Sequence, residues 1–211
     1  MTIHSGDNRP VPFLDTERGR LHCRRWSVDR PAARVALLPG TGQHSGHYHR
    51  FAAALLPAGI ELWTLDTSGQ GLSEGDPDAP GTIDELTADA RGFLELVRAD
   101  QPDAPVLMGH SLGAVTALNF ARENPSDLAG LIVCGTPRRA ADIAVDPGLA
   151  ALAVHGVDDR RAPIDVIRLW TQRHRSVDLR EYADAGHDLL HEPVQHRVAA
   201  DIAEWVLAAV R

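Results

Sequence analysis

A short apolar run passes directly into a Gly-x-Ser-x-Gly motif at Val106-Leu107-Met108-Gly109-His110-Ser111-Leu112-Gly113. Apolar residues at helical spacing follow at once, at Leu112, Val115, Leu118 and Ala121. A strand that leads straight into a helix makes a sharp turn, and this turn lifts the Ser111 hydroxyl out of the sheet. Gly109 and Gly113 lack Cβ atoms that would collide where the strand and the helix cross. The pentapeptide alone is a weak signal, but its place between strand and helix indicates a nucleophilic serine.

The length and composition predict one domain spanning residues 1–211. The chain is 44% hydrophobic, which is enough to build a sizeable core. Residues 1–12 are polar and carry no signal-peptide pattern, so we expect them to be flexible. No apolar run has the length of a transmembrane segment. Cys23 and Cys134 lie in strand-like runs, where two buried thiols are favoured over a disulfide, so we expect a cytoplasmic protein.

The charged residues exclude several classes of partner and chemistry. The net charge of −8 argues against nucleic acid as a partner. All 21 basic residues are arginine, and the lack of lysine excludes Schiff-base chemistry and Ser–Lys catalysis. His44, His47 and His49 raise the question of a metal, but their spacing matches no ligand template. We therefore expect neither a metal nor a cofactor.

The order of elements predicts an α/β fold. Strand-like and helix-like stretches alternate beyond about residue 30, which is typical of a parallel sheet with crossover helices. We expect a half-exposed edge strand over 20–28, buried strands over 35–38, 131–134 and 149–154, and further strands over 60–65, 106–108 and 177–182. We expect helices over 48–56, 83–97, 112–121, 163–170 and 194–206. Thr82 and Glu85 have the spacing of a capping box at the start of the second of these helices.

Two polar loops downstream of Ser111 supply partners for a nucleophile. A serine hydroxyl needs a base within hydrogen-bond reach, and a third group must orient that base. Asp159 lies in the loop after one predicted strand, and His187 lies in the loop after the last one. Parallel strands place their carboxyl ends at one edge of the sheet, so the three residues fall on successive loops of one rim.

These residues resemble the α/β-hydrolase fold, and more narrowly the serine hydrolases related to monoacylglycerol lipase and lysophospholipase, over about residues 33–205. Residues 42–48 are similar to the family's Gly-Glu-His-Ser-Gly-Arg-Tyr segment, and residues 66–75 are similar to its Asp-x-x-Gly-His-Gly-x-Ser-x-Gly loop. Residues 156–163 resemble its acid loop, and residues 186–193 resemble the segment of its catalytic histidine. The resemblance implies an α/β-hydrolase fold, a mostly parallel central sheet flanked by helices.

The resemblance also implies roles for individual residues. Ser111 would be the nucleophile, His187 the base and Asp159 the acid, because the family's acid stands three residues after the position of Gly156. The backbone N–H groups of Thr41 and Leu112 would form the oxyanion hole. Pro39-Gly40 replaces the family's His-Gly at this turn, and Gln70 replaces a common histidine.

Further residues are candidates for substrate contacts. Gly40 adjoins the predicted oxyanion hole, and His110, which we interpret mainly as a structural residue, precedes the nucleophile. Two arginine pairs border the predicted site, at Arg138-Arg139 and Arg160-Arg161. They either bind a phosphate or carboxylate of the substrate or are solvated loop residues.

The segment 136–148 is much shorter than the helical cap that the family usually carries, so we expect a minimal or absent lid and an open site. A partner protein or the second subunit of a homo-oligomer can complete such a site. The favoured function is a serine hydrolase (lipase, lysophospholipase or carboxylesterase) acting on a small-molecule or lipid ester through an acyl-enzyme. The alternatives are a thioesterase acting on a carrier-bound thioester, an accessory enzyme that transfers or cyclises an acyl group, and a non-catalytic binding module.

Overall fold

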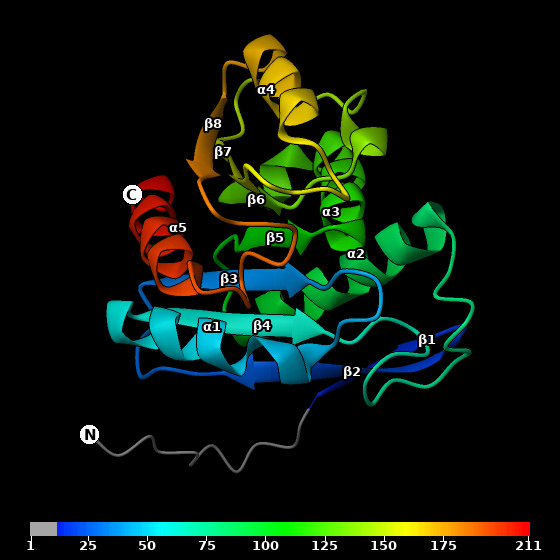
Figure 1. Cartoon of the computed structure of the whole chain (residues 1–211). Coiled ribbons are helices and arrows are strands. Elements are labelled where there is room, and N and C mark those ends of the chain that lie inside the picture. The colour runs from blue at the N-terminus through cyan, green and yellow to red at the C-terminus, as the bar shows by residue number, and fades with distance from the viewer. Residues whose placement is uncertain (1–11) are drawn as a thin grey trace.

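The computed structural model describes residues 12–211 (Figure 1). We expected residues 1–12 to be flexible. Except for Pro12, these residues lie outside the described range. The core is an eight-stranded sheet in the order β1-β2-β4-β3-β5-β6-β7-β8. The first two strands are antiparallel to their neighbours, namely β1 (Phe13–Thr16) and β2 (Gly19–Trp26). The parallel strands are β3 (Ala33–Leu38), β4 (Ile60–Leu65), β5 (Val106–His110), β6 (Gly130–Cys134), β7 (Ala151–Gly156) and β8 (Val177–Tyr182).

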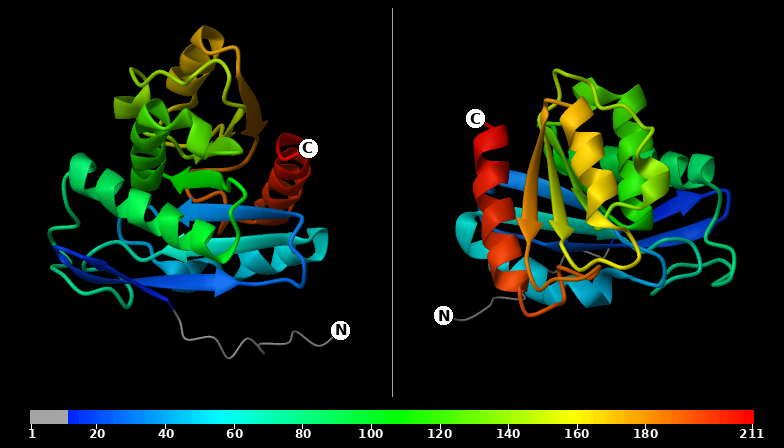
Figure 2. Two further views of the ribbon diagram at one scale, coloured as in Figure 1. Left: turned by 180° about the vertical axis from the view of Figure 1, so that it is seen from behind. Right: turned by 45° about the horizontal axis from the view of Figure 1, so that its top comes forward.

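Helices cover both faces of this sheet (Figures 1 and 2). On one face lie α1 (His49–Leu55) and α5 (Gln195–Ala209), with one apolar cluster beneath them. On the other lie α2 (Ile83–Asp100), α3 (Leu112–Glu123) and α4 (Ile164–Arg173), over a second cluster. Every residue of β3, β4, β5, β6 and β7 is buried, as expected of strands covered on both faces. The predicted fold class is therefore confirmed.

The capping box predicted at Thr82 is also confirmed. The Thr82 hydroxyl accepts a hydrogen bond from the Glu85 N–H at 3.3 Å, and the Glu85 carboxylate accepts one from the Thr82 N–H at 2.7 Å. These two bonds satisfy backbone donors that have no partner within the helix, and α2 begins at Ile83 as expected.

Several elements differ from the sequence predictions. The strand expected at the sheet edge over 20–28 is β2, which spans Gly19–Trp26 and lies between β1 and β4. The strand expected over 149–154 begins two residues later, at Ala151. Strand β1 was not predicted, because it is four residues long, lies at the sheet edge and contains no fully buried residue. Its pairing with β2, from Phe13 opposite His22 to Thr16 opposite Gly19, gives it a place in the sheet.

The connection between β6 and β7 contains the segment expected to replace the lid. It has a single-turn 3-10 helix, η4 (Arg138–Ala140), and then packs against the body of the protein. Ile143 and Val145 belong to the same apolar cluster as α3 and α4, and the Trp170 indole donates to the Ile143 carbonyl at 3.0 Å. This segment therefore lies against the helical layer.

Candidate active site

Ser111 occupies a strained turn between β5 and α3. Its backbone has φ 52° and ψ −111°, a conformation that L residues rarely adopt. A Cβ atom at Gly109 would overlap the Gly113 carbonyl oxygen, and one at Gly113 would overlap the Leu38 carbonyl oxygen. The Ser111 N–H donates to the Cys134 carbonyl at 2.9 Å, which fixes the turn against β6. The sharp turn predicted from the motif is present.

The structure brings Ser111, His187 and Asp159 into one chain of hydrogen bonds. His187 Nε2 lies 3.0 Å from Ser111 Oγ, and His187 Nδ1 lies 2.7 Å from Asp159 Oδ2. The three residues come from the loops after β5, β8 and β7, so they meet at the carboxyl edge of the sheet. This geometry allows His187 to accept a proton from the serine hydroxyl while it donates to the carboxylate.

Asp159 is held from both sides of its carboxylate. Its Oδ1 accepts hydrogen bonds from the backbone N–H groups of Arg161 at 2.9 Å and Ala162 at 2.8 Å. Burial pushes the pKa of Asp159 upward most strongly, but the hydrogen bonds from His187 and the Ala162 N–H outweigh it and lower this pKa. Asp159 therefore remains ionised and accepts the hydrogen bond from His187 Nδ1.

His155 supports the loop that carries Asp159, a role that the sequence reasoning missed. It is fully buried at the end of β7, and its Nε2 donates to the Ala162 carbonyl at 2.7 Å and lies 3.4 Å from Asp159 Oδ2. Burial lowers the pKa of His155, so its imidazole is neutral. The available signal was a histidine four residues before Asp159 in an otherwise apolar strand.

His110 lies behind the nucleophile and not in contact with the substrate space. It is 2% exposed, with Nε2 3.0 Å from the His187 carbonyl oxygen and Nδ1 2.8 Å from Gln43 Oε1. Burial lowers the pKa of His110 to about 4. Both ring nitrogens are engaged inside the protein, so the structure corrects the expectation that His110 contacts the substrate and agrees with its structural interpretation.

A crevice of about 210 Å³ adjoins the nucleophile, and Gly40, Thr41 and Leu112 line it. Within the described residues, neither the Thr41 N–H nor the Leu112 N–H donates to a protein acceptor. Leu112 opens α3, so its N–H is one of those left without an intrahelical acceptor. Both groups are thus free to donate to an oxyanion, and their role remains a prediction.

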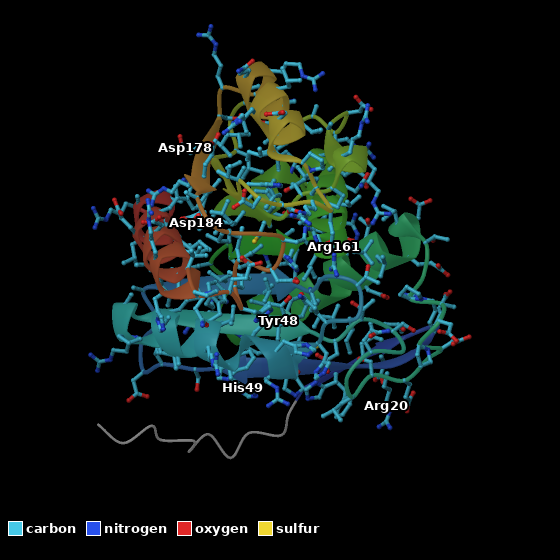
Figure 3. The ribbon with its side chains drawn as sticks, viewed as in Figure 1. Arg20, Tyr48, His49, Arg161, Asp178 and Asp184 are labelled. Atoms are coloured by element: carbon cyan, nitrogen blue, oxygen red, sulfur yellow. The ribbon has the colours of Figure 1, made fainter. Side chains whose placement is uncertain are left out.

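The four arginines lie on the neighbouring loops after β6 and β7. Arg138, Arg139, Arg160 and Arg161 are exposed, and Arg161 can be located in Figure 3. None of them forms an ion pair within the described residues, and none lines the 210 Å³ crevice. Only the backbone of Arg161 contacts the catalytic candidates, through Asp159. Their binding of a substrate anion therefore stays a prediction.

The arrangement of the side chains and helices over residues 12–211 bears on metal binding and on membrane insertion. No group of three or more histidine, cysteine, aspartate or glutamate side chains in this range is arranged to hold a metal ion. No helix in the same range combines the length and the apolar character needed to cross a bilayer.

Comparison with known proteins identifies related sequences and folds. The family model described as serine aminopeptidase, S33, matches residues 29–153. The monoglyceride lipase of Homo sapiens is 31% identical over 126 residues, 58% of this chain and 42% of the relative. The monoacylglycerol lipase of Mycolicibacterium smegmatis is 22% identical and aligns over 87% of this chain and 91% of its own. This chain thus spans about two fifths of the human relative but most of the bacterial one.

Solved structures share the fold at low sequence identity. Est1E from Butyrivibrio proteoclasticus, solved with ferulic acid, has a TM-score of 0.82 at 14% identity and covers 94% of this chain and 99% of its own. A soluble variant of monoglyceride lipase from Saccharomyces cerevisiae has a TM-score of 0.78 at 15% identity, covering 95% of this chain and 96% of its own. Because the S33 model matches more than half of the sequence, the chain belongs to this family of monoglyceride-lipase-like α/β-hydrolases.

Proposed function

We propose that this chain is a serine hydrolase that cleaves carboxylic esters through an acyl-enzyme on Ser111. The proposal rests on one observation, the hydrogen-bonded chain in which His187 lies 3.0 Å from Ser111 Oγ and 2.7 Å from Asp159 Oδ2. The relatives named monoglyceride lipase support an ester as the substrate.

In the acylation step, Ser111 Oγ attacks the ester carbonyl while His187 Nε2 takes the hydroxyl proton. Asp159 stabilises the resulting imidazolium through His187 Nδ1. The carbonyl oxygen becomes negative and accepts hydrogen bonds from the Thr41 and Leu112 N–H groups. His187 then gives its proton to the departing alcohol. In deacylation, His187 activates a water molecule that attacks the acyl-enzyme and releases the acid.

Thioester hydrolysis would use the same three side chains, so the triad does not separate it from ester hydrolysis. A thioester departs as a thiol and an ester as an alcohol, and both leaving groups receive their proton from His187. The two activities are distinguished by measuring kcat/KM for an oxygen ester and a thioester that carry the same acyl group.

A fluorophosphonate probe tests the proposal, because it reacts with an activated serine whatever the natural acyl group. We expect labelling of the native protein, none with Ser111→Ala, and labelling slowed by about 10³–10⁴-fold with His187→Ala or Asp159→Asn. Asp158→Asn is the matched control, since Asp158 is exposed and the hydrogen-bond partners of the His187 ring in the described residues are Asp159 and Ser111. It should label at the native rate. Equal labelling of the Asp159 and Asp158 variants, or no labelling of the native protein, would contradict the proposal.

A further inference from the structure

We propose that the crevice beside Ser111 is an acyl-binding subsite for a compact acyl group that carries a hydrogen-bond donor, either a hydroxyl or an ammonium. This inference rests on the proposed ester hydrolysis and narrows its substrate class. The crevice has a volume of about 210 Å³ and lies between the loop 40–42 and the loop that follows β4.

The position of the crevice assigns it to the acyl side of the ester. Thr41 and Leu112, the two predicted oxyanion donors, line it, so the carbonyl group stands at its mouth. The leaving alcohol must lie next to His187 Nε2, because His187 supplies its proton. No residue from the loops that carry His187 and Asp159 lines the crevice. The group that enters it is therefore the one that stays bonded to Ser111.

The volume limits the size of that group. With about 210 Å³, the crevice is smaller than a pocket that buries a drug-sized ligand. Pockets that bury a drug-sized ligand measure about 300–1,000 Å³. A fatty-acyl chain of sixteen or eighteen carbons would leave most of its length in water. The crevice suits an acyl group of about eight carbons or fewer.

The polar atoms of the wall select a hydrogen-bond donor. Gln70 and Asp78 line the crevice, and no arginine or histidine does. The Gln70 amide nitrogen donates one of its two hydrogens to the Pro77 carbonyl at 3.2 Å, and no described residue donates to the Gln70 amide oxygen. The Asp78 carboxylate accepts no hydrogen bond from another described residue. Asp78 is the one charged side chain among the described residues that line the crevice, so its carboxylate would repel a carboxylate on the acyl group, whereas a hydroxyl or ammonium would find an acceptor there.

The wall that carries Asp78 is held in place by contacts within the loop after β4. The Ala79 N–H donates to the Asp76 carbonyl at 3.1 Å, and the Asp78 N–H donates to Asp76 Oδ1 at 2.9 Å. Gly69 packs so closely against Asp76 that a Cβ atom would overlap the Asp76 backbone. The subsite is therefore held open by hydrogen bonds within the loop after β4 and does not depend on a lid.

A chain-length series tests the size limit. With esters of one alcohol and unbranched acyl groups of two to twelve carbons, we expect kcat/KM to fall at least tenfold between the octanoyl and dodecanoyl esters. Dodecanoyl esters cleaved as fast as butyryl esters would overturn the limit. The fluorophosphonate reaction is measured on the same samples, so loss of ester hydrolysis altogether is distinguished from loss of acyl selectivity.

The chemistry of the wall is tested with Asp78→Asn on propionyl, 3-hydroxypropionyl and 3-aminopropionyl esters. We expect the variant to lower the ratio of kcat/KM for a donor-bearing ester to kcat/KM for the propionyl ester by about two- to fivefold. This is the size of effect that an exposed charged pair usually contributes. An effect confined to the amino ester identifies an ammonium, and an effect on the hydroxy ester identifies a hydroxyl. Asp158→Asn makes the same charge change outside the crevice and should move neither ratio. The proposal is overturned if Asp78→Asn leaves both ratios unchanged.

Discussion

Gln43 Nε2 donates a 3.1 Å hydrogen bond to Asp188 Oδ1, and this bond joins the oxyanion loop to the loop that carries His187. The oxygen of the same carboxamide accepts a hydrogen bond from the Tyr48 hydroxyl at 2.5 Å. It also lies 2.8 Å from the Nδ1 of His110, which precedes the nucleophile. One side chain thus contacts all three loops that must be aligned for acyl transfer.

Replacing Gln43 with leucine should therefore reduce activity and stability together. The buried Tyr48 hydroxyl loses its acceptor, which costs about 1–3 kcal/mol of unfolding free energy. Small displacements of reacting groups are costly, so we expect kcat/KM to fall by about 10–100-fold. Denaturant unfolding and ester hydrolysis measure the two effects. Gln172→Leu, on the exposed side of α4, is the control and should change neither.

If the Gln43→Leu variant keeps native kcat/KM while its stability falls, the bridge contributes to folding alone. That outcome would contradict a role in aligning the oxyanion loop with His187.

The sequence predicted the features that depend on local contacts. Gly109 and Gly113 meet across one turn, so a pentapeptide encodes that contact. Continuous apolar runs identified the buried strands, because both faces of the sheet are covered. The contacts of Gln43 with Asp188 and of His155 with Ala162 join residues on different loops. No local pattern specifies which polar side chains meet there, and these contacts were not predicted.

The residues that line the crevice were harder to predict for the same reason. The four rim arginines were singled out by their charge and proximity in sequence, but the crevice is lined instead by Gln70 and Asp78. The loop after β4 folds back so that Pro77 reaches Gln70, and this return is a tertiary contact. Composition identifies charged residues, whereas only the folded loop shows which of them lie beside the oxyanion donors.

The strained backbone of Ser111 predicts an unusual stabilising substitution. A residue at φ 52° and ψ −111° costs on the order of 1–3 kcal/mol unless it is glycine. Ser111→Gly relieves this strain, whereas Ser111→Ala removes the same hydroxyl and keeps the strain. Glycine also raises the conformational entropy of the unfolded chain, which offsets part of this gain. We therefore expect the glycine variant to be more stable than the alanine variant by about 1 kcal/mol. Denaturant unfolding measures the difference, and equal stabilities would count against strain at this turn.

The close crossing of β5 and α3 predicts a large cost for a single methyl group. A Cβ at Gly113 would overlap the Leu38 carbonyl oxygen, and neither backbone can move without disturbing the sheet. We expect Gly113→Ala to lower the unfolding free energy by about 3 kcal/mol or more, as other overpacked core sites do. Gly148→Ala is the control, since its Cβ would approach only the end of the Asp146 side chain. Similar melting temperatures for both variants would contradict the tight crossing.

The buried His110 predicts a loss of stability in mild acid. Burial lowers its pKa from 6.5 to about 4, so the unfolded chain binds a proton in that interval that the folded chain does not. The stabilisation is complete above pH 6.5 and is lost as the pH falls towards 4. At 1.36 kcal/mol per pKa unit, His110 contributes about 3 kcal/mol to this loss. Asparagine does not titrate. Between pH 7 and 4, the unfolding free energy of His110→Asn should therefore fall by about 3 kcal/mol less than that of the native protein. Parallel pH profiles for the two proteins would show that His110 is protonated in the folded state.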